Sequence, residues 1–105
     1  MTDWSIAHST EVASWLKTLR TEDASRAMKV LDQLANLGGA LGMPRSRNLG
    51  GGLYELRFRC EHVDRRITYT LRPERRIITL TTFRKQRRNE RAEIARARLM
   101  LRRTP

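Results

Sequence analysis

The chain has 105 residues, and we expect a single domain over residues 1–105. Apolar residues make up 39% of the chain and charged residues 31%, a balance that supports one modest core and excludes disorder. No apolar run approaches the roughly 20 residues of a membrane span, and the N-terminus has no signal-peptide pattern. The single cysteine, Cys60, excludes an intrachain disulfide and a multi-cysteine zinc site. We therefore expect a cytoplasmic protein without membrane contact, metal or other cofactor.

The formal net charge is +11, and almost all of it lies in the second half of the chain. Residues 53–105 contain sixteen basic and six acidic side chains, whereas residues 1–52 contain six and five. Nineteen of the 22 basic residues are arginine, whose planar group can bind a phosphate through paired hydrogen bonds. This distribution favours a nucleic acid or ribosomal partner over the alternative of a merely solubilising surface.

The first part of the chain predicts a short strand followed by a helical hairpin. Residues 4–8 alternate between apolar and polar side chains, as a strand does. Ser9 is suited to cap a helix whose apolar residues recur at helical spacing up to Leu19. A second amphipathic helix begins near Thr21 and ends at Gly38-Gly39. We expect residues 43–52, which contain Pro44 and three consecutive glycines, to form a loop.

Beyond this loop the apolar residues recur at every second position, which predicts strands around residues 54–60, 66–71 and 78–81. Short turns at residues 61–64 and 72–75 separate them, so we expect an antiparallel meander. Asn89 is suited to cap a final helix with an apolar stripe. The fold class is therefore α+β.

If the helices cover the apolar face of this sheet, the other face is left open. The predicted helix-covered side carries Leu56, Phe58, Ile67, Tyr69, Ile78 and Leu80. The predicted open side carries Arg57, Arg66, Thr68 and Thr79. A register slip of one residue would invert every side chain, so this assignment is a sharp expectation.

The arginine-rich face supplies the candidate chemistry. Cleavage of RNA by its own 2′-hydroxyl passes through a dianionic phosphorus centre, which nearby cations stabilise without a metal. Arg57, Arg66, Arg84 and Lys85 are the candidate cations, with Glu55 among them. The alternative is that these arginines only grip phosphate, or pair with Glu55 and Glu61. The residue pattern alone favours binding over catalysis.

Four stretches together resemble the RelE/ParE superfamily of bacterial toxins, in its phage-derived HigB-like branch. They are residues 52–57 (Gly-Leu-Tyr-Glu-Leu-Arg), 66–69 (Arg-Ile-Thr-Tyr), 78–85 (Ile-Thr-Leu-Thr-Thr-Phe-Arg-Lys) and 93–97 (Glu-Ile-Ala-Arg-Ala). The resemblance implies a RelE-like fold with two N-terminal helices against the sheet. It also implies a metal-independent, ribosome-dependent endoribonuclease that is held inactive by a cognate antitoxin.

Carried over by residue, the resemblance assigns Arg57 and Arg66 to the family's sheet arginines. Lys85 matches the second lysine of the family's Phe-x-Lys-Lys. Glu55 is the candidate general base, although pairing with Arg57 is an equal alternative. The chain departs from the family at residues 86–89, where Gln-Arg-Arg-Asn replaces the usual lead-in to the last helix.

We therefore expect the toxin of a type II toxin–antitoxin system that acts as an mRNA interferase. The predicted catalytic residues are Arg57, Arg66, Lys85 and Glu55. The predicted RNA- or phosphate-binding residues are Arg59, Arg84, Arg87, Arg88, Arg45 and Arg47. Expected partners are mRNA, the ribosome and a helix-turn-helix antitoxin through which the protein oligomerises. The alternatives are a ParE-type toxin that poisons gyrase and a binding module without chemistry.

Overall fold

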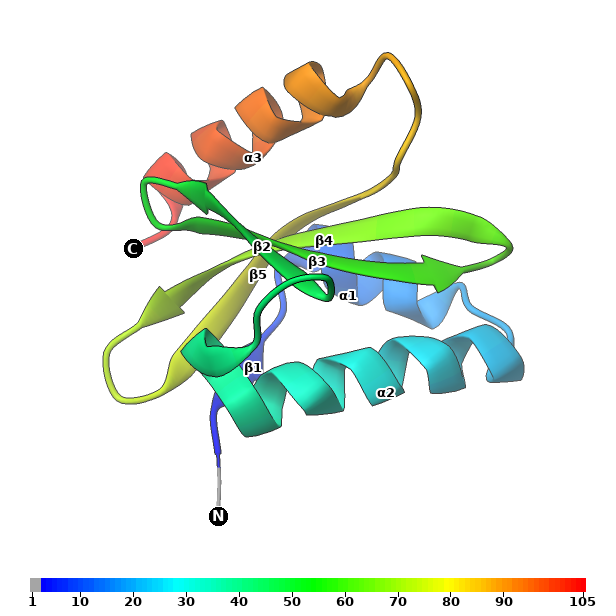
Figure 1. Cartoon of the computed structure of the whole chain (residues 1–105), viewed down its shortest axis with the longest axis horizontal. Helices are drawn as coiled ribbons and strands as arrows, with labels where there is room; N and C mark the ends of the chain where they lie inside the picture. The colour runs from blue at the N-terminus through cyan, green and yellow to red at the C-terminus, as the bar shows by residue number, and fades with distance from the viewer. Residues whose placement is uncertain (1–2) are drawn as a thin grey trace.

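A five-stranded sheet in the order β1-β5-β4-β3-β2 forms the centre of the computed structural model, which describes residues 3–105 (Figure 1). Helices lie on both faces of this sheet. In chain order the elements are β1 (Ser5–Ala7), α1 (Thr10–Lys17), α2 (Thr21–Leu37), η1 (Gly38–Ala40), β2 (Ser46–Gly50), β3 (Leu53–Cys60), β4 (Val63–Arg72), β5 (Arg76–Arg84) and α3 (Glu90–Arg103). None of the described helices is long and apolar enough to cross a membrane.

The sheet is mixed, because its edge strand β1 runs parallel to β5 while every other neighbouring pair is antiparallel. The predicted first strand, helical hairpin, three-stranded meander and final helix are all present. The α+β class is confirmed, whereas the direction of β1 could not be deduced from residue alternation.

The start of α1 and the end of α2 are each set by a local residue that the sequence predicts. The hydroxyl of Ser9 accepts a hydrogen bond from the Val12 amide at 3.2 Å, which satisfies a free donor in the first turn of α1. Gly38 ends α2 with φ at 50°, a conformation that glycine adopts at little cost. A Cβ at this position would lie 2.0 Å from the Trp4 indole, so close packing also requires glycine there.

Two tight turns set the register of the meander. Glu61 and His62 connect β3 to β4 with φ values of 56° and 63°, the left-handed pair that suits a two-residue hairpin. Pro73, Glu74 and Arg75 connect β4 to β5, and Glu74 and Arg75 have φ values of 66° and 53°. Both turns were predicted, and the first one places Arg57 of β3 opposite Arg66 of β4.

The prediction of a loop over residues 43–52 is wrong in part, because β2 lies within it. This strand pairs antiparallel with β3 and forms the sheet edge, with a register shift between Asn48 and Gly50. Its Ser46 hydroxyl bonds to the hydroxyl of Tyr69. An edge strand is held mainly by backbone hydrogen bonds and needs no apolar alternation, so its sequence lacked the usual signal.

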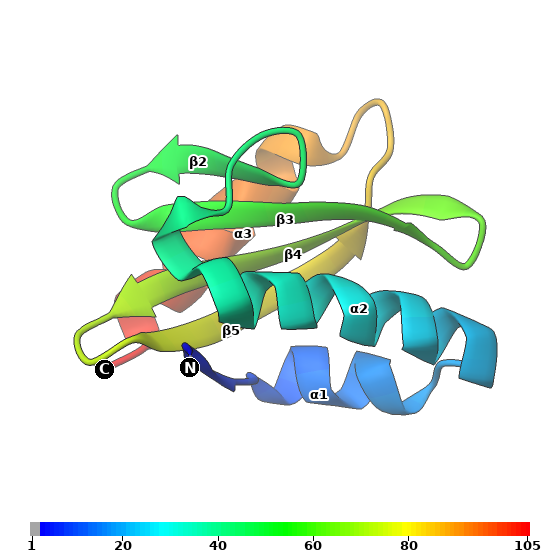
Figure 2. The ribbon, with the colours of Figure 1, turned by 60° about the horizontal axis from the view of Figure 1, so that its bottom comes forward.

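One face of the sheet packs on α1 and α2 (Figure 2). The predicted inward positions of β3 and β4 are confirmed, since their apolar side chains join the cluster beneath these helices. That cluster contains Val12, Ala27, Val30, Leu31, Leu34, Leu56, Phe58, Cys60, Ile67, Tyr69 and Ile77.

The prediction that the other face is open is wrong in part, because α3 packs against it beside β5 and β3 (Figure 1). A second apolar cluster forms there around Leu53, Leu80 and Ala97. Arg66 and Thr68 do lie on this face, but both are buried. The apolar stripe of α3 had to be buried somewhere, and only this face of the sheet was free to receive it.

The predicted faces of β5 are also wrong. Ile78 and Leu80 pack toward α3, whereas Ile77 occupies the side of α1 and α2. Thr79 lies toward the start of α1, where its hydroxyl accepts a hydrogen bond from the Ser9 amide at 3.1 Å. Adjacent apolar residues at 77 and 78 made the alternation ambiguous, and a β-bulge near Thr68 shifts the phase of the strand further along.

Candidate functional site

Arg57 and Arg66 lie opposite each other on adjacent strands, on the face that also carries α3. The Arg57 side chain is 29% exposed and that of Arg66 only 6%. Both border an open hollow of about 290 Å³ whose other lining residues are Pro44, Phe58, Arg59 and Asp64. The geometry therefore offers one accessible guanidinium, with a second one buried beside it.

Glu55 lies beneath this pair and is almost fully enclosed, with 1% of its side chain exposed. Its Oε1 lies 3.5 Å from the Arg66 Nε and 4.0 Å from the Arg57 Nε. Neither carboxylate oxygen accepts a hydrogen bond. Burial raises the pKa of Glu55, and the opposing charge of Arg66 does not fully offset it. Catalysis by Glu55 stays a prediction, and this enclosed position favours the alternative of ion pairing.

Arg66 is held from its own strand. Its Nη1 donates to the carbonyl of Arg65 at 3.3 Å, while its Nε has no hydrogen-bond partner. Burial lowers the pKa of Arg66, and the nearby carboxylate of Glu55 works against that shift. Arg66 therefore contributes its charge beside the hollow, with little accessible surface.

Arg57 is fixed through its backbone by Arg45. The Arg57 amide donates to the Arg45 carbonyl at 2.8 Å, and the Arg45 Nη1 donates back to the Arg57 carbonyl at 2.9 Å. The Arg57 side chain also reaches the Met43 sulfur, at 3.5 Å from Nη1. Arg45, predicted as a phosphate-binding residue, thus also holds β3 in place just before the start of β2.

Lys85 follows β5 directly and is held beside the other two strands. Its amide donates to the Asp64 carbonyl at 2.8 Å. Arg66 is paired with Phe83, so Lys85, two residues further along, shares their face of the sheet. Its Nζ lies 4.0 Å from a carboxylate oxygen of Glu90 in α3. The fold thus gathers Arg57, Arg66 and Lys85 on one face, and their catalytic roles stay predictions.

Arg59 stands at the rim of the hollow. Its Nη1 lies 3.3 Å from a carboxylate oxygen of Asp64, and its Nη2 donates to the His62 carbonyl at 2.9 Å. Both contacts are exposed, so an incoming phosphate can compete for this guanidinium.

The other predicted cations surround the site without joining the hollow. Arg84 is exposed at the end of β5, and Arg87 and Arg88 are exposed in the link to α3. Arg47 is exposed on β2, where it pairs in register with Glu55. These four side chains add positive field around the arginine pair.

Residues 86–89, which link β5 to α3, form a turn that is held by hydrogen bonds from the Asn89 side chain. The Asn89 Oδ1 accepts from the Gln86 amide at 2.9 Å, and its Nδ2 donates to the Arg84 carbonyl at 3.0 Å. Asn89 holds the predicted N-cap position of α3, but its side chain makes no capping bond to the helix. The unusual lead-in to α3 is therefore an ordered turn.

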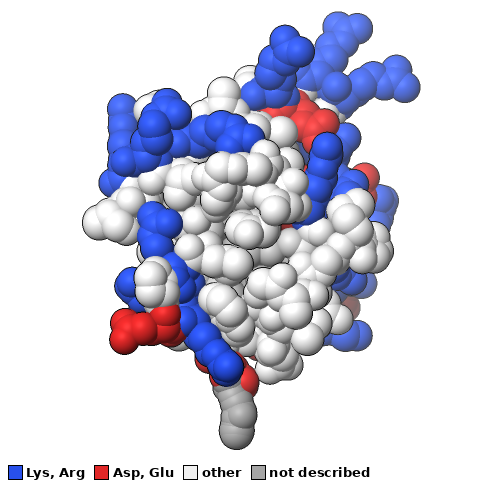
Figure 3. Space-filling model, turned by 60° about the vertical axis from the view of Figure 1, so that its left-hand side comes forward, with Lys and Arg blue, Asp and Glu red and all other residues white. Residues whose placement is uncertain are grey.

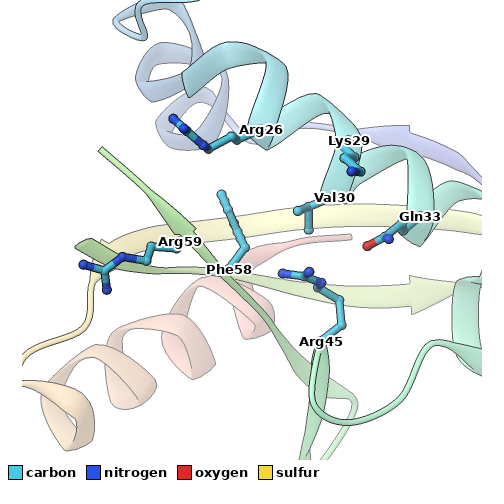
Figure 4. Close-up of a pocket in the computed structure, with 7 residues that line it drawn as sticks. All are labelled: Arg26, Lys29, Val30, Gln33, Arg45, Phe58 and Arg59. Carbon is cyan, nitrogen blue, oxygen red and sulfur yellow. The ribbon is translucent and has the colours of Figure 1, made fainter. Parts of the chain in front are cut away.

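A second basic hollow, of about 280 Å³, was missed from the sequence (Figure 4). It lies between α2 and the β3 edge and is lined by Arg26, Lys29, Val30, Gln33, Arg45, Phe58 and Arg59. The four residues from α2 follow an i, i+3, i+4, i+7 spacing, so they share one helix face. The sequence signal for this hollow was the spacing of two cations, Arg26 and Lys29, beside the buried stripe of α2.

The described residues offer neither a cluster of metal-ligating side chains nor an exposed thiol. Among residues 3–105, no three His, Cys, Asp or Glu side chains are grouped as a metal site requires. Cys60 is buried in the core beside α2, and burial raises the pKa of its thiol. This is the position of a cysteine that packs as a small apolar side chain.

Together these features define a small basic α+β protein whose mixed sheet carries opposed arginines between two helical layers. Residues 14–102 match the sequence profile of the family described as phage derived protein Gp49-like (DUF891). The chain belongs to this Gp49-like family, which is a known family of toxin–antitoxin toxins. No curated protein shows significant similarity to the chain.

Proposed function

We propose that this protein is the toxin of a type II toxin–antitoxin system, of the HigB-like branch of the RelE/ParE superfamily, and that it cleaves mRNA on the ribosome. Membership of the Gp49-like family supports the toxin assignment. The observation that carries the nuclease assignment is the opposed pair Arg57 and Arg66 at one open hollow, with Lys85 on the same face.

The reaction requires the RNA 2′-oxygen to lose its proton to a base, either Glu55 or solvent water, and to form a bond to phosphorus. The bond from phosphorus to the 5′-oxygen breaks, and that leaving oxygen takes up a proton from water. Negative charge accumulates on the phosphoryl oxygens in the transition state, and fixed cations stabilise it. In this account Arg57 contacts those oxygens directly, Arg66 adds its buried charge, and Lys85 lies toward the leaving oxygen.

Glu55 has a supporting role in the same account. Enclosed between two guanidinium groups, the Glu55 carboxylate limits the repulsion between the two arginines. Its ion pair with Arg66 keeps the buried cation from being an uncompensated charge.

The partners follow from the same proposal. A cognate antitoxin of the helix-turn-helix type inhibits the toxin and organises its oligomer in the cytoplasm. An acidic segment of that antitoxin would neutralise the positive field around the hollow. It would cover the arginine pair, displace α3, or do both.

The test is to incubate the purified protein with mRNA, alone and with translating ribosomes, and to map the 3′ ends that form. Cleavage only on ribosomes supports the proposal. Double-strand breaks in DNA in a parallel reaction with gyrase would instead identify a ParE-type toxin. RNA binding without cleavage in any reaction would identify a binding module.

A further inference from the structure

We propose that the hollow between α2 and the β3 edge is a second site for single-stranded RNA, which receives nucleotides that flank the scissile phosphate. This inference rests on the proposed function, because it extends the path of the same substrate. The hollow of about 280 Å³ adjoins the arginine-pair hollow, since Phe58 and Arg59 line both.

The lining of the second hollow suits a phosphodiester chain. Four of its seven residues are cationic and none is acidic. Figure 4 shows Phe58 projecting from β3 toward α2, with Lys29, Val30 and Gln33 coming from α2. Val30 and Phe58 are core side chains, each 6% exposed, and their exposed edges can contact a base. The cations can contact phosphate and Gln33 offers hydrogen bonds.

Lys29 is the cation most available to a ligand. Arg26 is paired with Asp23 at 3.1 Å, and Arg59 with Asp64 at 3.3 Å. Within residues 3–105, the Lys29 side chain makes neither an ion pair nor a hydrogen bond. An unpaired cation beside apolar side chains favours a polyanion with flat, weakly polar bases over a simple inorganic ion.

Arg45 connects the two hollows. Its side chain lines the second hollow, and its Nη1 also bonds the carbonyl of Arg57, which borders the first. Arg45 precedes β2 and bonds β3 at Arg57, and residues 58–60 of β3 have no partner in β2. An RNA strand can therefore pass from one face of the sheet around this edge to α2.

The test measures binding of a 2′-O-methyl uridine decanucleotide, which lacks the 2′-hydroxyl and cannot be cleaved. Lys29→Ala and Gln33→Glu are compared with Lys17→Ala, a matched loss of one exposed lysine outside the hollow. We expect Lys29→Ala and Gln33→Glu to weaken binding about three- to tenfold, and Lys29→Ala to lower the salt slope by about one. Lys17→Ala should change affinity less than about twofold, since it only reduces the general field.

Equal losses for Lys29→Ala and Lys17→Ala would contradict the second site. A ten-residue peptide of alternating aspartate and leucine provides a further comparison. If Lys29→Ala weakens only the peptide, the hollow binds an acidic protein segment and the RNA proposal is wrong. Ribosomal mRNA cleavage by the unchanged protein is measured in parallel, and its absence contradicts the proposed function, whereas the RNA-binding comparison judges the hollow by itself.

Discussion

Glu55 lies between two arginines. The balance between its burial and their positive charges sets its pKa, and thereby the response of the site to pH. Its carboxylate is buried, it has no hydrogen-bond donor, and it depends on Arg66 and Arg57 for compensation. Burial outweighs these cations and raises its pKa above the ordinary value of 4.5. A folded-state pKa above the unfolded value means that the folded protein holds its proton more tightly.

This shift predicts how Glu55→Gln changes the pH dependence of stability. The Glu55 contribution is fully present below about pH 4.5 and is lost as pH rises through the higher folded-state pKa. The stability of the unchanged protein relative to Glu55→Gln should therefore decrease as pH rises over this range. Urea unfolding of both proteins at several pH values measures the difference. A relative stability that increases with pH would contradict the burial argument.

At the scale of elements, α3 is fastened to α1 across the edge of β5. Arg96 of α3 makes two hydrogen bonds to the Glu11 carboxylate of α1, one of them 3.0 Å long, and also pairs with Glu93. The same carboxylate accepts the Thr82 amide of β5 at 2.8 Å. Burial would raise the pKa of Glu11, but Arg96 and the Thr82 amide prevail and lower it.

This contact predicts a pH-dependent fastening of α3. A lowered folded-state pKa contributes stability above the unfolded value of 4.5, and this is lost as pH falls through the folded value. Arg96→Ala should cost on the order of 1 kcal/mol near neutral pH, because the pair is partly exposed. Amide hydrogen exchange should quicken along α3. Arg103→Ala, an exposed change on the same helix, should alter neither the stability nor the amide exchange of α3. Equal effects of Arg96→Ala and Arg103→Ala would show that the contact with Glu11 is unimportant.

The end of α2 gives a second prediction at this scale. Gly38 has φ at 50°, and an added Cβ would lie 2.0 Å from Trp4, so Gly38→Ala combines backbone strain with a steric clash. We expect a loss of about 2–4 kcal/mol in the free energy of unfolding. Gly42→Ala is the matched control, since a Cβ there meets nothing within 4 Å. Urea unfolding measures both, and similar stabilities would contradict the packing of Trp4 on this turn.

The elements also show what the sequence could predict. Ser9, Gly38 and the two hairpin turns act through local chemistry, so they were visible without coordinates. β2 was missed because an edge strand is held by its neighbour's backbone. The face covered by α3 depends on contacts between distant segments, and adjacent apolar residues in β5 left two assignments open.

The candidate site, too, could be predicted from the sequence only in part. Sequence alternation placed Arg57 and Arg66 on one face correctly, but it implied an exposure that the buried Arg66 does not have. The pairing of Lys85 with Glu90 and the contribution of Lys29 depend on the path of the helices, so single-strand periodicity did not reveal them.

At the scale of the whole molecule, the charge of +11 is unevenly arranged. Figure 3 brings forward the left-hand side of Figure 1 and shows a broad uncharged centre with lysine and arginine gathered toward its margins. The arginine pair, Arg59 and Lys85 come from the neighbourhood of the β3–β4 turn and the link to α3. Such a layout directs a polyanion to one region of the surface.

In the proposed reaction, side chains from separate strands act together on one scissile phosphate, and this cooperation depends on the whole fold. Single-turnover mRNA cleavage on saturating ribosomes tests it most directly. Arg57→Ala and Lys85→Ala should each slow the chemical step about 10²–10³-fold, equivalent to roughly 2–4 kcal/mol. The double variant Arg102→Ala/Arg103→Ala, at the end of α3, should cleave at nearly the unchanged rate. Unchanged cleavage rates for Arg57→Ala and Lys85→Ala, with only weaker binding, would contradict a catalytic role for both residues.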